Sequence, residues 1–205
     1  MIVISRPTAA RPTRSSVTES SSGRGAARAD TMRLAARVAV VTFASVLVVA
    51  GVVHVALAAG AREWLGYSFP GVPPRADVAV AIFAHNSRAI LGVFGLLLIA
   101  QIAARAPQGP GRVLRIIRGG GELILAGMIA ANVFVVGAAI GAYGVRMAKA
   151  VLPHGPVELA AYSLALGLYL QGSRRALPAA HLIKLAGASV AVLALAAALE
   201  TSVNV

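Results

Sequence analysis

An almost unbroken apolar run from Val38 to Ala61 constrains the fold of this chain more than any other feature. About 24 residues of this kind are enough for a helix to cross a hydrocarbon core of roughly 30 Å with some tilt. The composition agrees, because 58% of the 205 residues are hydrophobic and 13% are charged. Such a chain is typical of an integral membrane protein that contacts the lipid bilayer.

Four further apolar segments follow the first one. They cover about 78–104, 122–144, 156–170 and 182–200. A polar break at His85–Arg88 interrupts the first of them, so either one long tilted helix contains the break or an interfacial segment turns into the span there. The sequence therefore predicts an all-α fold, a polytopic membrane helix bundle of about five transmembrane helices.

The distribution of positive charge predicts the orientation of this bundle. Most of the 19 Lys and Arg residues lie in the N-terminal tail and in the segments that follow the second and fourth spans. Short cytoplasmic loops hold an excess of Lys and Arg, so we expect a cytoplasmic N-terminus and an external C-terminus. The same argument accounts for the net charge of +12 without a nucleic-acid partner.

The chain divides into two predicted parts. Residues 1–31 are rich in Ser, Thr, Arg and Pro, and they cannot bury enough apolar area to offset the entropy of ordering. We predict a disordered, basic cytoplasmic tail over 1–31 and a transmembrane helical domain over 32–205.

The segment from Pro153 to Glu158 places an imidazole and a carboxylate four residues apart at the start of an apolar helix. With Pro156 in the first helical turn, Glu158 lies near the N-terminus of the helix, where free N–H groups and the dipole favour a carboxylate. We expect His154 to cap this helix and Glu158 to hydrogen-bond a neighbouring helix.

Other polar residues near the predicted spans are candidates for function, since ionisable groups inside a membrane cost roughly 2.5 to 3.5 kcal/mol each. His85 and Asn86 are expected either to cap a helix or to contact the His154 turn. Glu200 closes the last span near the outer interface. His54, alone in the first span, is expected to serve in helix packing rather than as a proton relay.

Two features of the third span predict helix contacts. Asn132 lies deep in the span, where interhelical hydrogen bonding is its ordinary use. Gly137 and Gly141 share one helix face, and small residues at that spacing let two helices approach closely.

The sequence offers no recognisable catalytic constellation. It contains no cysteine, so a thiolate zinc site and a cysteine nucleophile are excluded. A serine protease of the Gly-x-Ser-x-Gly type lacks its motif. A zinc-dependent membrane enzyme stays an alternative only where His85 and His154 approach each other and find a third ligand. We therefore expect a non-enzymatic protein with no metal and no cofactor.

The segment Leu152–Ala161 resembles the most specific motif of the stage II sporulation protein M family of bacterial integral membrane proteins. Its Pro-His-Gly-x-x-Glu core, with His154, Gly155 and Glu158, is intact. The resemblance covers about residues 38–202.

Weaker marks of the same family accompany this motif, and two positions depart from it. A polar segment with an Asn opens the second span, an Asn precedes a Gly by five residues in the third, and an Ala-rich last helix closes with Glu-Thr; the residues are Asn86, Asn132, Gly137, Glu200 and Thr201. His85 stands where the family often has the first of paired Asn residues. Val133 stands where it has Gly, so close backbone approach at that step is less assured.

The resemblance implies a scaffold of the bacterial plasma membrane that positions proteins of cell-envelope (peptidoglycan) remodelling. In spore formers the family member is implied to act in engulfment with cell-wall hydrolases, the stage II sporulation proteins D and P. Self-association into a homo-oligomer is left open. The rival interpretation is a permease or transporter subunit, in which His54, Asn132 and the outer His and Glu residues line a polar path. No inverted repeat supports that rival.

Overall fold

The computed structural model describes residues 16–67, 76–106 and 111–202, and the regular structure in these ranges is entirely helical. The elements in chain order are α1 (Ser16–Val52), the π-helix η1 (Val53–Leu57), α2 (Ala58–Leu65), α3 (Ala76–Arg105), α4 (Arg112–Tyr143), α5 (Val145–Val151), α6 (Gly155–Gly172) and α7 (Ala179–Ser202). The predicted all-α class is confirmed.

Four helical segments of the described chain are long and apolar enough to cross a membrane: Gly25–Leu65, Asp77–Arg105, Arg112–Tyr143 and Ala179–Thr201. Large apolar side chains on them remain exposed, among them Val40, Val55 and Leu123. Such exposure is expected where lipid rather than water surrounds the helices. The chain therefore has the architecture of a multi-pass membrane protein, with four such helices where the sequence predicts about five spans.

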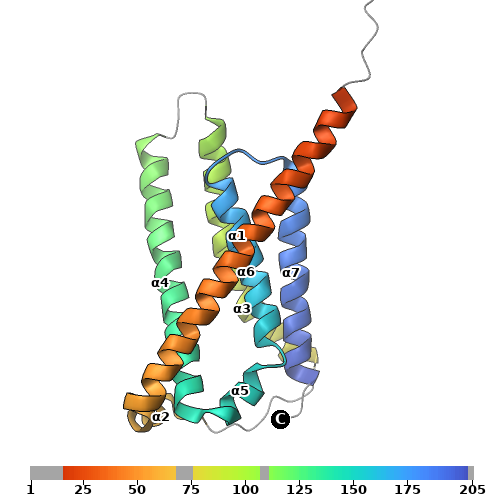
Figure 1. The fold of residues 1–205 in the computed structure, drawn as a ribbon. Coiled ribbons are helices and arrows are strands. Elements are labelled where there is room, and N and C mark those ends of the chain that lie inside the picture. The colour runs from red at the N-terminus through yellow and green to blue at the C-terminus, as the bar shows by residue number, and fades with distance from the viewer. Residues whose placement is uncertain (1–15, 68–75, 107–110, 203–205) are drawn as a thin grey trace, which may run out of the picture.

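The remaining predicted span corresponds to α6, which lies in the middle of the bundle (Figure 1). It has 18 residues and packs against α1, α3 and α7. Its buried side chains Ala165 and Leu168 join those of α3 and α7 in the main apolar core. Because these neighbours cover α6, it can carry Glu158 and Gln171, which are costly on a lipid-facing helix.

α1 crosses the bundle diagonally, and its two halves pack on different helices (Figure 1). Its first half lies on α6, where a Cβ at Gly167 would come within 2.7 Å of the Ala35 nitrogen. Its second half lies on α4, where a Cβ at Gly141 would be 2.5 Å from the Ala50 oxygen. Gly137 makes a similar approach one turn earlier. The close contact predicted for this glycine pair is present, and α1 is the partner.

α1 begins within the segment that the sequence assigns to the N-terminal tail. The structure has helix over residues 16–31, where the sequence predicts disorder, while residues 1–15 lie outside the described ranges. Near the end of this segment, tertiary contacts that composition does not reveal join the helix to α6 and α7. Thr31 is fully buried, and Asp30 forms an ion pair with Arg175 at 2.9 Å.

α3 is one continuous helix from Ala76 to Arg105. The polar break His85–Arg88 therefore lies within a single long helix, which decides between the two alternatives that the sequence leaves open.

The five residues of the π-helix η1 form a wider helical turn directly before α2. Downstream of it, Arg62 Nε donates a hydrogen bond of 2.6 Å to the Ala142 oxygen. The ring of Trp64 lies 6.2 Å from that of Phe134, measured between centroids. α2 is thus held against the end of α4, and it stops at Gly66, whose φ of 61° suits glycine.

Candidate functional site

Polar side chains gather near both ends of α6, with the apolar core between them. The cluster near its start is formed by Asn86, Glu158, Tyr162 and Glu200, and we call it the Glu158 cluster. The network near its end is formed by Ala27, Asp30, Thr31, Gln171, Arg175 and His181, and we call it the Thr31 network.

The start of α6 has the geometry that the sequence predicts. His154 is the N-cap residue, and its carbonyl accepts hydrogen bonds from the nitrogens of Val157 at 3.0 Å and Glu158 at 2.9 Å. Pro156 occupies the first turn, and Glu158 is the acidic residue there. The His154 side chain makes no capping hydrogen bond. The cap is therefore made by the backbone, and it fixes where Glu158 enters the bundle.

Glu158 joins α6 to α3. The side-chain amide of Asn86 donates a hydrogen bond to the Glu158 carboxylate. The Tyr162 hydroxyl donates one of 3.0 Å to the backbone carbonyl of Asn86. Glu200 of α7 is near enough for its carboxylate to act electrostatically on that of Glu158. Of the two alternatives that the sequence leaves for Asn86, the structure has the contact with the His154 turn and not the cap, because Asn86 lies inside α3 and bonds Glu158.

Gly155, the motif glycine between the cap and Pro156, is placed where space is short. A Cβ at this position would come within 2.6 Å of Val151 Cγ1, a side-chain atom at the end of α5. Glycine therefore allows the tight passage from α5 into α6.

His85 does not join the Glu158 cluster. Its side chain is exposed, although it neighbours Asn86 in α3. In the parts of the chain that the structure describes, no group of three His, Cys, Asp or Glu side chains is arranged to hold a metal ion.

Asn132 is placed differently from its prediction. It is exposed on α4, and its side-chain amide donates to the Met128 carbonyl of the same helix at 2.9 Å. The prediction that Asn132 hydrogen-bonds another helix is therefore wrong. α4 is apolar on nearly every face, so its sequence did not reveal which face turns inward. Along that same helix, the Gly141 oxygen lies 3.2 Å from His54 Nδ1, which fits the packing role expected for that histidine.

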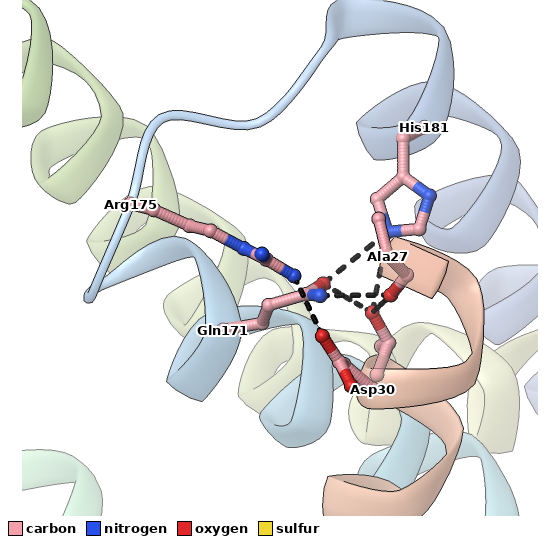
Figure 2. Close-up of polar contacts among 6 residues, drawn as sticks. Ala27, Asp30, Gln171, Arg175 and His181 are labelled. Carbon is pink, nitrogen blue, oxygen red and sulfur yellow. Dashed lines mark hydrogen bonds and ion pairs between the residues drawn. The ribbon is translucent and has the colours of Figure 1, made fainter. Parts of the chain in front are cut away.

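The Thr31 network joins α1 to α6 and α7, and sequence reasoning missed it (Figure 2). The Thr31 hydroxyl contacts Gln171 Oε1 and lies 3.2 Å from His181 Nε2. Gln171 Nε2 donates a 2.7 Å hydrogen bond to the Ala27 oxygen. Thr31 and Gln171 are 0% and 3% exposed, so their polar atoms depend on one another for hydrogen bonds.

Gln101 ties α3 to the α6–α7 connection close to this network. Its Nε2 donates to the oxygens of Gly172 at 2.7 Å and Arg175 at 3.2 Å, and its Oε1 accepts from the Leu177 nitrogen at 2.8 Å. Arg105 adds a 2.8 Å bond to the Leu177 oxygen. One buried side chain thus satisfies three backbone groups, one on the last residue of α6 and two in the connection that follows it.

Glu122 ties α4 to α6 at the same end. Its carboxylate accepts a hydrogen bond from the Tyr169 hydroxyl and pairs with Arg118 at 2.9 Å. The only sequence signal for these contacts is the presence of Gln101, Glu122 and Gln171 in apolar helices, and that signal does not name their partners.

Comparison with protein-family models, curated proteins and solved structures finds no match to this chain.

Proposed function

We propose that this protein is a non-enzymatic scaffold of the bacterial plasma membrane, similar to the stage II sporulation protein M family, that positions partners of cell-envelope remodelling. The observation that carries the proposal is the hydrogen bond between Asn86 and Glu158. It fastens the His154 turn, the most specific part of the resemblance, to a second helix. A fixed turn at one end of the bundle is a suitable platform for a partner.

In this proposal α6 is a fifth transmembrane helix and the N-terminus is cytoplasmic. The helices α1, α3, α4, α6 and α7 run in alternating directions (Figure 1). The end where α1 starts carries Arg105, Arg112, Arg174 and Arg175, and we call it the basic end. The positive-inside rule orients this end toward the cytoplasm. The Glu158 cluster then faces the cell wall.

Reporter fusions test this topology. A C-terminal alkaline phosphatase is expected to be active, and a C-terminal green fluorescent protein is expected to be dark, because both would lie outside the plasma membrane. The opposite pattern would place the Glu158 cluster in the cytoplasm and contradict a role at the cell wall.

The interior of the bundle favours a scaffold over a permease. Between the ends of α6, the core is mainly apolar, with side chains such as Val93, Leu97 and Leu168, and it also holds the buried serines Ser163 and Ser189. A solute path would need polar groups across this layer. Asn132, which the permease hypothesis puts on the path, is exposed on the outside of α4. Substrate-dependent flux in liposomes that is lost in Glu158→Gln would support the permease instead.

The proposed role is tested by deleting the gene and imaging newly made cell wall. We expect mislocalised wall synthesis that the wild-type gene corrects. Asn86→Asp, which sets a second carboxylate against Glu158, is expected not to correct wall synthesis at an equal protein level, whereas Asn132→Leu should correct it as the wild-type gene does. Unchanged wall synthesis, division and sporulation in the deletion strain under all growth conditions would refute the role.

A partner can be sought with a photo-crosslinking residue at the α5–α6 turn. Leu152 is 71% exposed there, and Leu123, which is 75% exposed on α4, provides a matched lipid-facing control. We expect an envelope protein crosslinked at position 152 and not at position 123. Equal products at both sites would indicate contact with bulk membrane proteins rather than a docking platform.

A further inference from the structure

A groove of about 310 Å³ lies between α1 and α6. Its lining residues are mainly apolar: Leu34, Arg37, Val38, Val41, Thr42 and Leu170. The direction of the groove follows from α6, since helical spacing places Leu170 between Gly167, which contacts α1, and Tyr169, which bonds Glu122 of α4. The groove therefore opens on the side where α1 diverges from α4 toward the basic end (Figure 1).

Two arginines stand at the rim of this groove. Arg37 lines it, and Arg33 lies one turn earlier on the same face of α1. Both are exposed, and neither makes a hydrogen bond or an ion pair with another residue that the structure describes. Arg105, Arg118 and Arg175 at the same end are all bonded to neighbours. The rim thus offers two guanidinium groups without an internal partner beside an apolar floor.

We propose that the groove binds an anionic phospholipid, with one acyl chain against Val38, Val41 and Leu170 and the phosphate on Arg33 and Arg37. A guanidinium fork suits two phosphate oxygens at once, and an arginine stem can lie along apolar surface while its head reaches the interface. Phospholipid is also the neighbour that membrane-crossing helices always have. The inference needs the membrane location alone and does not depend on the scaffold role.

A second copy of the chain is a less suitable occupant. A symmetric contact through this face would bring Arg33 and Arg37 of both copies together, and like charges without counter-ions oppose such a contact. An anionic headgroup neutralises the same two charges.

The test is native mass spectrometry of delipidated protein in detergent, titrated with phosphatidylglycerol or phosphatidylcholine. The wild-type protein is expected to retain phosphatidylglycerol several-fold better than phosphatidylcholine. Arg33→Gln/Arg37→Gln should lose this preference, and Leu170→Trp, which fills the groove without changing charge, should lose it too. Arg112→Gln/Arg115→Gln is the control, because it removes the same charge from exposed positions at the same end.

Each outcome decides for or against the proposal. If the control variant lost the preference for phosphatidylglycerol equally, the preference would come from diffuse electrostatic attraction to the basic end rather than from a lipid bound in the groove. If glycerol phosphate, which has no acyl chains, displaced the bound phosphatidylglycerol, the binding site would not include the groove. A dimer that Leu170→Trp dissociates would assign the groove to a second copy. Unchanged melting temperatures of the variants ensure that a lost preference reflects binding and not unfolding.

Discussion

Gly167 of α6 lies so close to Ala35 of α1 that a Cβ at position 167 would come within 2.7 Å of the Ala35 nitrogen and 2.9 Å of the Thr31 oxygen. Both obstacles are backbone atoms, which cannot move aside as a flexible side chain can. This contact sets how deeply α1 settles on α6, and hence whether Thr31 reaches Gln171.

Gly167→Ala is expected to lower the free energy of unfolding by about 1–3 kcal/mol, because the added methyl overpacks a filled contact. Gly187→Ala in α7 is the matched control, since a Cβ there meets nothing within 4 Å. It should be neutral or stabilising by up to about 1 kcal/mol. Unfolding of purified protein in detergent, followed by circular dichroism, measures both. Equal melting temperatures for the two variants would contradict the close fit of α1.

The bond between Asn86 and Glu158 is open to a double-mutant cycle. Asn86→Ala removes the amide that donates to a half-buried carboxylate, so we expect a loss of about 1–3 kcal/mol. Glu158→Gln keeps an acceptor oxygen and should cost less. The cycle with Glu158→Ala should return a coupling free energy of about 0.5–2 kcal/mol. Additive effects of the two alanine variants would mean that the residues do not interact in the membrane.

Gln101→Leu is expected to loosen the α6–α7 connection more than it affects the rest of the bundle. It leaves the Gly172 oxygen and the Leu177 nitrogen without the side chain that bonds them. Trypsin should therefore cleave faster after Arg174 and Arg175, by roughly tenfold for each 1.4 kcal/mol lost from local opening. Digestion of protein in detergent, read by mass spectrometry, gives the rate at this site.

The control for that experiment is cleavage at Arg146 and Lys149 in α5, near the opposite end of the bundle. Their cleavage rate should stay unchanged in Gln101→Leu. Faster cleavage at all sites would indicate global destabilisation instead.

Asn132→Leu is expected to leave stability within about 0.5 kcal/mol of wild type, because the side chain bonds only its own helix and is exposed. It should also leave any liposome flux unchanged. A large loss of stability would mean that Asn132 contacts another helix or a second copy in the membrane, which is what its sequence position first suggested.

Sequence patterns predict most of the helical architecture for simple physical reasons. Long apolar runs with polar ends specify helices in lipid, and Pro156 after a His-Gly pair marks where α6 begins. The pair Gly137 and Gly141 predicts a close helix contact, although not that α1 is the partner.

Rotation about the helix axis is what the sequence leaves undetermined. Asn132 faces outward and Asn86 inward, yet both are single asparagines in apolar helices. An amphipathic helix reveals its inner face by periodic polar residues, and these helices have too few of them. Gln171 and His181 find Thr31 only through the tertiary fold, because Thr31 precedes them by 140 and 150 residues.

The diagonal course of α1 has a consequence for assembly. The ribosome makes α1 before α4 and α6, and the hydroxyl of Thr31 can meet Gln171 only after the intervening chain has been made, because the two residues are 140 positions apart. During synthesis α1 therefore lies in the bilayer without its α6 partner, and its two halves dock at different times, on α4 first and on α6 later.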